Sequence, residues 1–158
     1  MKLFFAILTI TMLFAISLKV DAGEYMLLPI DEVYDGDTIK THISESRLPA
    51  PLNKLSIRIN GIDTPESPAK SFAETGKLGR ASCEKEAFMA LKATEAVEFL
   101  VLKSTTKTMK VENFRHGKFG GRVLADVTIA GVDVATHLIS QGLAIPYHGE
   151  KKSHNWCE

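Results

Sequence analysis

The sequence predicts an α+β fold, and two patterns along the chain support this prediction. Short segments in which apolar and polar residues alternate, as they do in strands, occur on both sides of one long segment with helical periodicity. Strands and helices do not alternate throughout, as they would in a parallel sheet built from crossover units. The length of 158 residues fits one domain that buries a single hydrophobic core. We therefore expect one α+β domain.

Residues 1–22 predict a secretory signal peptide. A basic start, Met1-Lys2, precedes an apolar run over residues 3–18, and small residues occupy the positions that precede a cleavage site. A membrane anchor is the alternative, but the apolar run is shorter than the roughly 20 residues that span a bilayer. We expect cleavage after Ala22. The mature domain, residues 23–158, would then be exported to the periplasm or the extracellular space, without stable membrane association.

The mature domain is expected to be nearly neutral. The chain has 19 basic and 19 acidic residues, and loss of Lys2, Lys19 and Asp21 with the leader leaves 17 basic and 18 acidic residues. Net charge therefore identifies no class of partner. The chain carries no direct indication of its oligomeric state, and a monomer is the expectation.

The two cysteines, Cys83 and Cys157, are expected to form a disulfide. Export would place them in an oxidising compartment, where two such residues pair by default. The chain-entropy model gives a bridge of this span a stabilising effect of about 4 kcal/mol. The alternative is a metal site that uses His154 and Cys157, but no second ligand pair at zinc spacing accompanies them.

The first half of the domain predicts three strands. Residues 25–34 and 37–43 form a hairpin around the turn dipeptide Asp35-Gly36, and residues 55–60 form the third strand. Residues 67–79 lack periodicity and are expected to form an exposed loop.

A long helix is predicted over residues 80–103. Apolar and small residues recur in it at steps of three or four, which is typical of a core-facing stripe. The stripe consists of Cys83, Ala87, Leu91, Thr94, Val97 and Val101.

The second half returns to short elements. Strands are predicted over residues 108–114, 122–130 and 143–147, and Asp133 caps a short helix over residues 134–141. Three strands, a long helix, two strands and a short helix fit a closed, five-stranded antiparallel barrel of the OB type.

Acidic and basic residues gather near the ends of two predicted strands. Asp37 falls on the core face of its strand, where a carboxylate is costly unless a cation or several donors meet it. The alternative is that Asp37 accepts backbone amides of its own turn. Arg58 faces away from the core, so strict alternation places it opposite Asp63 unless a bulge at Asn60-Gly61 shifts the phase.

The segment Asp63-Thr64-Pro65-Glu66 allows two interpretations. It could cap a helical turn, with Pro65 in the first turn and Glu66 completing a capping box. Alternatively, Asp37, Asp63 and the carbonyl of Thr64 supply hard oxygen ligands, which favour calcium, or magnesium as the second choice.

The arginines and the remaining acid complete a hydrolytic site in the second interpretation. Arg58 and Arg122 suit a phosphate, because guanidinium matches its oxygens two at a time. Arg122 follows a glycine-rich loop with cationic side chains over residues 115–121. Glu66 would then orient or deprotonate a water. Together these groups predict metal-assisted hydrolysis of a phosphodiester.

Four strings resemble the staphylococcal nuclease (thermonuclease, micrococcal nuclease-like) family: VYDGDTIK, IRINGIDTPE, KFGGRVLADV and LISQGLAIPY. The resemblance covers about residues 33–147. It implies a calcium-dependent nuclease on an OB-type barrel that cuts both DNA and RNA and leaves 3′-phosphate ends.

The same resemblance implies roles for individual residues. These are Asp37, Asp63 and the Thr64 carbonyl as calcium ligands, Arg58 and Arg122 as catalytic contacts to phosphate, Glu66 as the catalytic residue that acts on water, and Lys118 and Tyr147 as contacts to the nucleotide. A noncatalytic OB-type module that binds nucleic acid is the alternative function. Such a module would need stacking aromatic residues more than it needs this set of acids and arginines.

Overall fold

The computed structural model describes residues 24–44, 47, 50, 53–118, 120, 122–150, 152 and 154–158. The predicted signal peptide lies outside the described residues, as do Phe119 and Gly121 of the predicted glycine-rich loop. In the described part of the chain, no helix combines the length and the hydropathy that crossing a bilayer requires.

A seven-stranded sheet dominates the part of the chain that the structure describes, and its strand order is β1-β6-β7-β4-β3-β2, with β8 paired to β7. Its strands are β1 (Tyr25–Pro29), β2 (Glu32–Asp35), β3 (Thr38–His42), β4 (Lys54–Ile59), β6 (Thr108–His116), β7 (Arg122–Ile129) and β8 (Val132–Asp133). A second ladder pairs β5 (Ile62–Asp63) with β9 (Ile145–Pro146). The fold is therefore α+β, as predicted, with the sheet as its framework.

The sheet curls, because its first and last strands are neighbours in the sequence. Only Ile30 and Asp31 separate β1 from β2, and the Thr41 hydroxyl on β3 donates to the Pro29 carbonyl on β1 at 2.7 Å. Within the described residues, however, no ladder joins β1 to β2. The predicted closed barrel is therefore not observed as a hydrogen-bonded cylinder.

The sheet is also not wholly antiparallel, which corrects the prediction. Strands β4 and β7 run parallel, with Ser56 opposite Arg122 and Arg58 opposite Leu124. A parallel pair needs a long crossover connection, which α2 and β6 supply here.

The predicted first strand over residues 25–34 is two strands. Tyr25–Pro29 pairs with β6, whereas Glu32–Asp35 pairs with β3. Pro29 has no amide hydrogen to continue the ladder, and the chain changes partner immediately after it. The hairpin turn at Asp35-Gly36 lies where it was predicted.

Helix α2 (Glu84–Lys103) begins four residues later than predicted. Cys83 is its N-cap, and the sulfur of Cys83 accepts the amide of Glu86 at 3.4 Å. The buried face of α2 consists of Glu86, Ala87, Ala90, Ala93, Val97 and Leu100. The predicted stripe was therefore wrong at Leu91, which is 40% exposed.

Close packing of α2 on the sheet explains the shift of the stripe. Small alanines face the β2–β3 turn, and a Cβ added to Gly36 would lie 2.7 Å from the Cβ of Ala93. Alanine has a weak hydrophobic signal, so the sequence pattern pointed to the larger Leu91 instead. Gly36 is thus required by the close approach of the helix.

The predicted exposed loop over residues 67–79 contains a short helix, α1 (Phe72–Thr75). Phe72 is buried and packs with Leu78, Ala81 and Ala87 in a small second core. A helix of four residues is too short to produce a periodic pattern, so the sequence did not reveal it. This small core fixes the segment that leads into α2.

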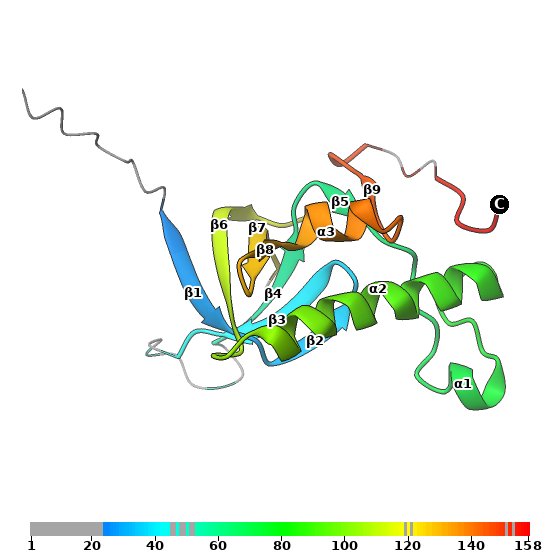
Figure 1. Cartoon of the computed structure of the whole chain (residues 1–158), viewed down its shortest axis with the longest axis horizontal. Helices are drawn as coiled ribbons and strands as arrows, with labels where there is room; N and C mark the ends of the chain where they lie inside the picture. The colour runs from blue at the N-terminus through cyan, green and yellow to red at the C-terminus, as the bar shows by residue number, and fades with distance from the viewer. Residues whose placement is uncertain are drawn as a thin grey trace, which may run out of the picture.

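The C-terminal elements agree with their predictions. Helix α3 (Val134–Ser140) is capped by Asp133, whose carboxylate accepts the amide of Thr136 at 2.7 Å. Cys83 and Cys157 form a disulfide with their Cα atoms 6.0 Å apart, which rules out a metal site at Cys157. Figure 1 shows α1 and the C-terminal tail at the end of the molecule where α2 begins.

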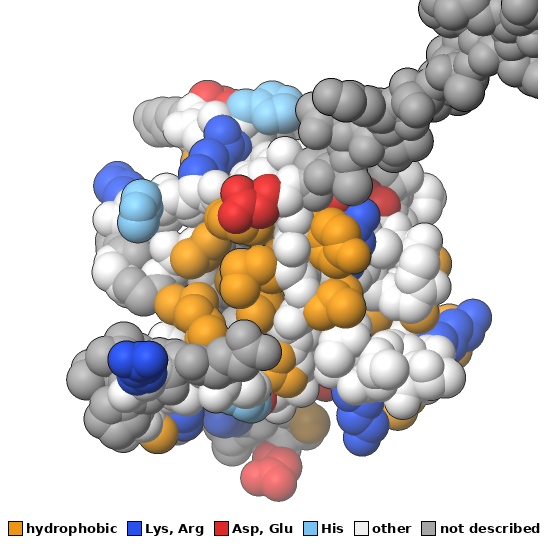
Figure 2. All heavy atoms as spheres, turned by 90° about the vertical axis from the view of Figure 1, so that its left-hand side faces the viewer, with side chains coloured by type: hydrophobic (Ala, Val, Ile, Leu, Met, Phe, Trp, Pro, Cys, Tyr) orange, Lys and Arg blue, Asp and Glu red, His pale blue; other side chains and the backbone are white. Residues whose placement is uncertain are grey.

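The main core lies between the sheet and the two larger helices. Its largest fully buried side chains include Ile39, Ile57, Ile59, Ile62, Met109, Ile129 and Leu138. The face at the β1 end, seen in Figure 2, also carries hydrophobic side chains at the surface. Tyr25, Met26 and Leu27 of the edge strand β1 are exposed.

Candidate active site

The β2–β3 turn buries two carboxylates side by side. The amide of Asp37 donates to the Asp35 carboxylate at 3.3 Å, and the Asp37 side chain is almost inaccessible, with 1% of the residue exposed. Arg58 donates to Asp37 at 2.5 Å, and Thr64 donates to it through both its amide, at 3.2 Å, and its hydroxyl, at 3.0 Å. The buried carboxylate therefore meets a cation and donors from a distant segment, not amides of its own turn.

Burial raises the pKa of Asp37 to about 7, although the positive charge of Arg58 opposes this effect. The neighbouring Asp35 raises the pKa further, because two negative charges repel each other at short range. A second positive charge near Asp37 would favour its ionised form. The electrostatics of this corner thus suit a cation.

Arg58 joins Asp37 to Asp63. Its Nη2 donates to Asp63 at 3.0 Å, while its Nη1 donates to Asp37. The change of strand phase that this contact requires occurs at Asn60-Gly61, where Gly61 has a φ of 78°. The feature is a tight turn between β4 and β5 and not a bulge within one ladder. Gly61 fits this left-handed conformation because it has no Cβ.

The segment after Asp63 does not cap a helix. Residues 64–69 have no regular secondary structure, and the amide of Glu66 donates to the carboxylate of Glu86 at 3.1 Å. The other oxygen of Glu86 accepts the amide of Ser82 at 2.6 Å. Glu86, which is buried at the start of α2, therefore fastens the backbone of Glu66 to the helix.

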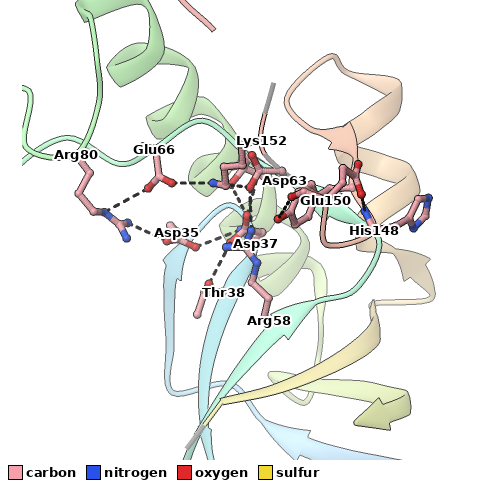
Figure 3. Close-up of polar contacts among 12 residues, drawn as sticks. Asp35, Asp37, Thr38, Arg58, Asp63, Glu66, Arg80, His148, Glu150 and Lys152 are labelled. Carbon is pink, nitrogen blue, oxygen red and sulfur yellow. Dashed lines mark hydrogen bonds and ion pairs between the residues drawn. The ribbon is translucent and has the colours of Figure 1, made fainter. Parts of the chain in front are cut away.

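Two cations that the sequence did not single out also contact the acids (Figure 3). Arg80 lies 3.2 Å from the Asp35 carboxylate and 3.5 Å from the Glu66 carboxylate. The Lys152 ammonium lies 2.8 Å from Asp63 and 2.9 Å from Glu66. Partial burial alone would lower the pKa of Lys152, but its hydrogen bonds to the two carboxylates raise it above the usual value.

Pattern analysis missed both cations: it placed Arg80 at the start of the predicted helix, whereas α2 begins only at Glu84, and Lys152 lies in a tail without periodicity. The predicted disulfide was the available signal for Lys152. It returns the C-terminal tail to Cys83 at the start of α2, the same helix end that holds Glu66 through Glu86.

The predicted site residues converge on one cleft of about 590 Å³. It is lined by Asp37, Arg58, Thr64, Glu66, Lys118, Arg122 and Tyr147, together with Asp35, Arg80, His116 and Lys152. Asp63 is buried and reaches this group through its contacts with Arg58 and Lys152. The structure therefore brings together residues from the β2–β3 turn, β4, the segment that joins β6 to β7, the start of β7 and the two segments that follow β5 and β9.

The donor set fits a hard cation that keeps part of its water. Asp37 and Asp63 meet at one guanidinium, and their oxygens, with a backbone carbonyl from the adjoining Thr64, are ligands of the kind that Ca²⁺ and Mg²⁺ prefer. No group of three or more His, Cys, Asp or Glu residues that could hold a metal ion occurs among the residues described. A hard cation held by these three protein groups would complete its coordination with water or substrate oxygens.

Comparison with known proteins identifies the family. No curated protein matches the chain significantly. The profile of the family described as staphylococcal nuclease homologue matches residues 56–156, which is more than half of the chain. This range contains Arg58, Glu66 and Arg122 of the cleft and the adjoining Asp63. The chain therefore belongs to the staphylococcal nuclease homologue family.

Proposed function

We propose that this protein is a calcium-dependent nuclease that hydrolyses phosphodiester bonds of DNA and RNA and leaves 3′-phosphate ends. Family membership indicates a nuclease or nucleic-acid-binding role. The observation that carries the proposal further is the cleft itself, in which Asp37, Arg58, Glu66 and Arg122 line one surface. These residues include carboxylate oxygens that can bind a metal ion, arginine N–H groups that can donate to phosphate oxygens, and a carboxylate that can orient a water.

In the proposed reaction, the two arginines bind the scissile phosphate. Arg122 begins β7 beside β4, so both guanidinium groups project from neighbouring strands into the cleft. Nη1 and Nη2 of Arg58 each donate a hydrogen bond, to Asp37 and to Asp63. A guanidinium has five N–H donors, so further N–H groups of Arg58 can donate to phosphate oxygens. The arginines stabilise the negative charge that grows on these oxygens as the transition state forms.

Glu66 is the proposed general base. Its carboxylate orients a water and takes a proton from it as the water oxygen attacks phosphorus. The bond from phosphorus to the 5′ oxygen breaks, and the departing 5′ oxygen takes a proton from solvent water to become a 5′-hydroxyl. When bound by Asp37, Asp63 and Thr64, Ca²⁺ supplies Lewis-acid polarisation of a phosphate oxygen. Lys118 and Tyr147, which also line the cleft, contact the nucleotide.

Three further properties belong to this proposal. We propose that the protein is exported after removal of residues 1–22 and acts as a monomer on nucleic acid in the periplasm or outside the cell. The disulfide between Cys83 and Cys157 supports an oxidising compartment. The curled sheet with α2 inserted after β5 supports an OB-type arrangement.

The test uses purified residues 23–158 with plasmid DNA and with RNA, in calcium, in magnesium and in chelator. We expect calcium-dependent cleavage of both substrates and products that a 3′-phosphatase converts to free 3′-hydroxyl ends. Intact DNA and RNA in calcium would contradict the nuclease proposal. Products with 5′-phosphate ends would contradict the proposed position of bond cleavage.

A noncatalytic nucleic-acid-binding module is the other function that the family allows. Such modules stack bases on several aromatic side chains. Tyr147 is the one Phe, Trp or Tyr among the described residues that line the cleft, which favours the enzyme. Binding of single-stranded DNA without any cleavage in calcium would favour the module.

A further inference from the structure

The C-terminal tail is anchored at the start of α2. The disulfide joins Cys157 to the N-cap residue Cys83, and the neighbouring Trp156 is buried. Lys85, in the first turn of α2, donates to the backbone carbonyl of Glu158. The residues that follow Lys152 are therefore anchored at the end of α2 that also holds Glu66.

Lys152 lies in this tail and places one ammonium group between two candidate catalytic acids. It contacts Asp63 at 2.8 Å and Glu66 at 2.9 Å (Figure 3). The same oxygen of Asp63, Oδ1, also accepts Arg58 at 3.0 Å. One oxygen of the proposed metal ligand is therefore already shared between two positive groups.

A divalent cation that binds Asp63 through this oxygen must displace Lys152 or remain beside its positive charge. Either alternative weakens cation binding, because like charges repel and a broken ion pair must be replaced. Glu66 is affected by the same ammonium, since the carboxylate that should act on water is held by a lysine. Release of Lys152 would free both acids in one movement.

We propose that Lys152 is an autoinhibitory cation, which the disulfide-anchored tail holds on Asp63 and Glu66 and which a divalent metal ion must displace. The inference rests on the proposed metal role of Asp63. It adds a residue outside the acid and arginine set and assigns the tail a regulatory task. Lys152 side-chain exposure is 46%, so the side chain can leave the acids without unfolding the domain.

The test measures calcium binding directly, by isothermal titration calorimetry in the absence of nucleic acid. Lys152→Met removes the ammonium and keeps the apolar stem of the side chain. We expect it to bind calcium about five- to fiftyfold more tightly than the wild type, a typical size for coupling between two ligands. Equal affinity, or weaker binding by Lys152→Met, would overturn the proposal.

Lys40→Met is the matched control. Lys40 forms an ion pair with Glu32 at 2.7 Å, and its side chain is 41% exposed, close to the 46% of Lys152, but it does not line the cleft. The control removes the same charge from the whole protein, so it reports the general effect of net charge. An equal gain in affinity for Lys40→Met would also overturn the proposal.

A second comparison tests the role of the tail anchor. The double variant Cys83→Ser, Cys157→Ser releases the tail, and a serine at position 83 still caps α2. We expect the double variant to gain calcium affinity, and Lys152→Met to add less than twofold in that background. A full additional gain would show that the anchor does not hold Lys152 on the acids.

The failures of the two proposals can be told apart. Thermal unfolding in chelator first establishes that each variant is folded, and the Lys152→Met result stands with the disulfide intact. If the wild type and Lys152→Met bind calcium with equal affinity, only the inhibitory role of Lys152 is overturned. No heat of calcium binding in any variant overturns both the inhibitory contact and the calcium-dependent nuclease.

Discussion

Arg58 and Arg80 each contact two carboxylates, but the two side chains differ in their exposure to water. Arg58 lies in the sheet, its side chain is 21% exposed, and its partners Asp37 and Asp63 are buried. Arg80 lies in the loop before α2, its side chain is 52% exposed, and its partners are the buried Asp35 and the partly exposed Glu66. The ion pairs of Arg80 therefore contribute less to stability than those of Arg58, because water screens the exposed guanidinium of Arg80.

The cleft thus has a buried half, formed by Asp37, Arg58 and Asp63, and an exposed half, formed by Glu66, Arg80 and Lys152. Strand pairing places the buried half, and the loop segments and the disulfide place the exposed half. We expect changes in the buried half to affect both stability and activity. Changes in the exposed half should affect activity with little change in stability.

The largest expected effect is on activity, in the exposed half. Glu66→Gln removes the proposed base but keeps the size of the side chain, so the rate in calcium should fall about 10²- to 10⁴-fold. The melting temperature should change little. Initial rates on plasmid DNA and thermal unfolding give both values. The control is Glu112→Gln, which breaks a surface pair with Lys110 away from the cleft.

Arg122→Ala should lose a comparable factor in rate, because it removes a contact to the charge of the transition state. A normal rate in Glu66→Gln and Arg122→Ala would refute both role assignments. A large fall in the melting temperature of Glu66→Gln would instead show that the exposed half is structural.

The next effect is on stability and compares the two arginines directly. Arg58→Met leaves Asp37 and Asp63 buried without their shared cation, which should lower the free energy of unfolding by about 3 kcal/mol. Arg80→Met should lower it by less than about 1 kcal/mol, since its side chain is half exposed. Urea unfolding in chelator measures both. Equal losses would remove the distinction between the two halves.

A pH effect should distinguish Asp37 from the other acids. The pKa of Asp37 is raised to about 7 in the folded protein, from an ordinary value of 3.8. The folded state therefore binds this proton more tightly than the unfolded state, and stability in chelator should fall as pH rises from about 4 to about 7. Asp37→Asn should remove this part of the decline. Parallel curves for the two proteins, measured by urea unfolding between pH 4 and 8, would contradict the expectation.

The smallest effect concerns Glu86, which fastens the backbone of Glu66 to α2. Glu86→Ala leaves the amides of Ser82 and Glu66 without their acceptor, so stability should fall by about 1 kcal/mol. The position of Glu66 should also become less defined, which should lower kcat by about tenfold with little change in KM. Glu86→Gln, which keeps one acceptor oxygen, should recover part of the rate. An unchanged kcat in Glu86→Ala would show that α2 does not position Glu66.

Sequence patterns predicted the buried half more completely than the exposed half. Alternation along β4 placed Ile57 and Ile59 in the core and Arg58 on the opposite face, and Gly61 marked the change of phase that joins Arg58 to Asp63. These features are local in sequence and follow the two-residue period of a strand.

The exposed half depends on contacts between distant, irregular segments. Lys152 meets Glu66 across 86 residues, and nothing in the pattern around either residue specifies their approach. The four-residue helix α1 and the alanine-rich face of α2 were missed for a related reason. Short elements and small side chains produce weak periodic signals, although close packing depends on them.

The parallel pairing of β4 with β7 also determines when the cleft can exist during folding. Arg58 and Arg122 come from these two strands, which α2 and β6 separate in the sequence. The chain must therefore close this long connection before the two strands can pair. Contacts of such long sequence separation form slowly, because the chain must first close a large loop. The hairpin of β2 and β3 can form early, but the surface that we propose to bind phosphate, with its two arginines, forms only in a nearly complete domain. Under the proposed function, a newly made chain would therefore contact nucleic acid through both arginines only after its second half has folded.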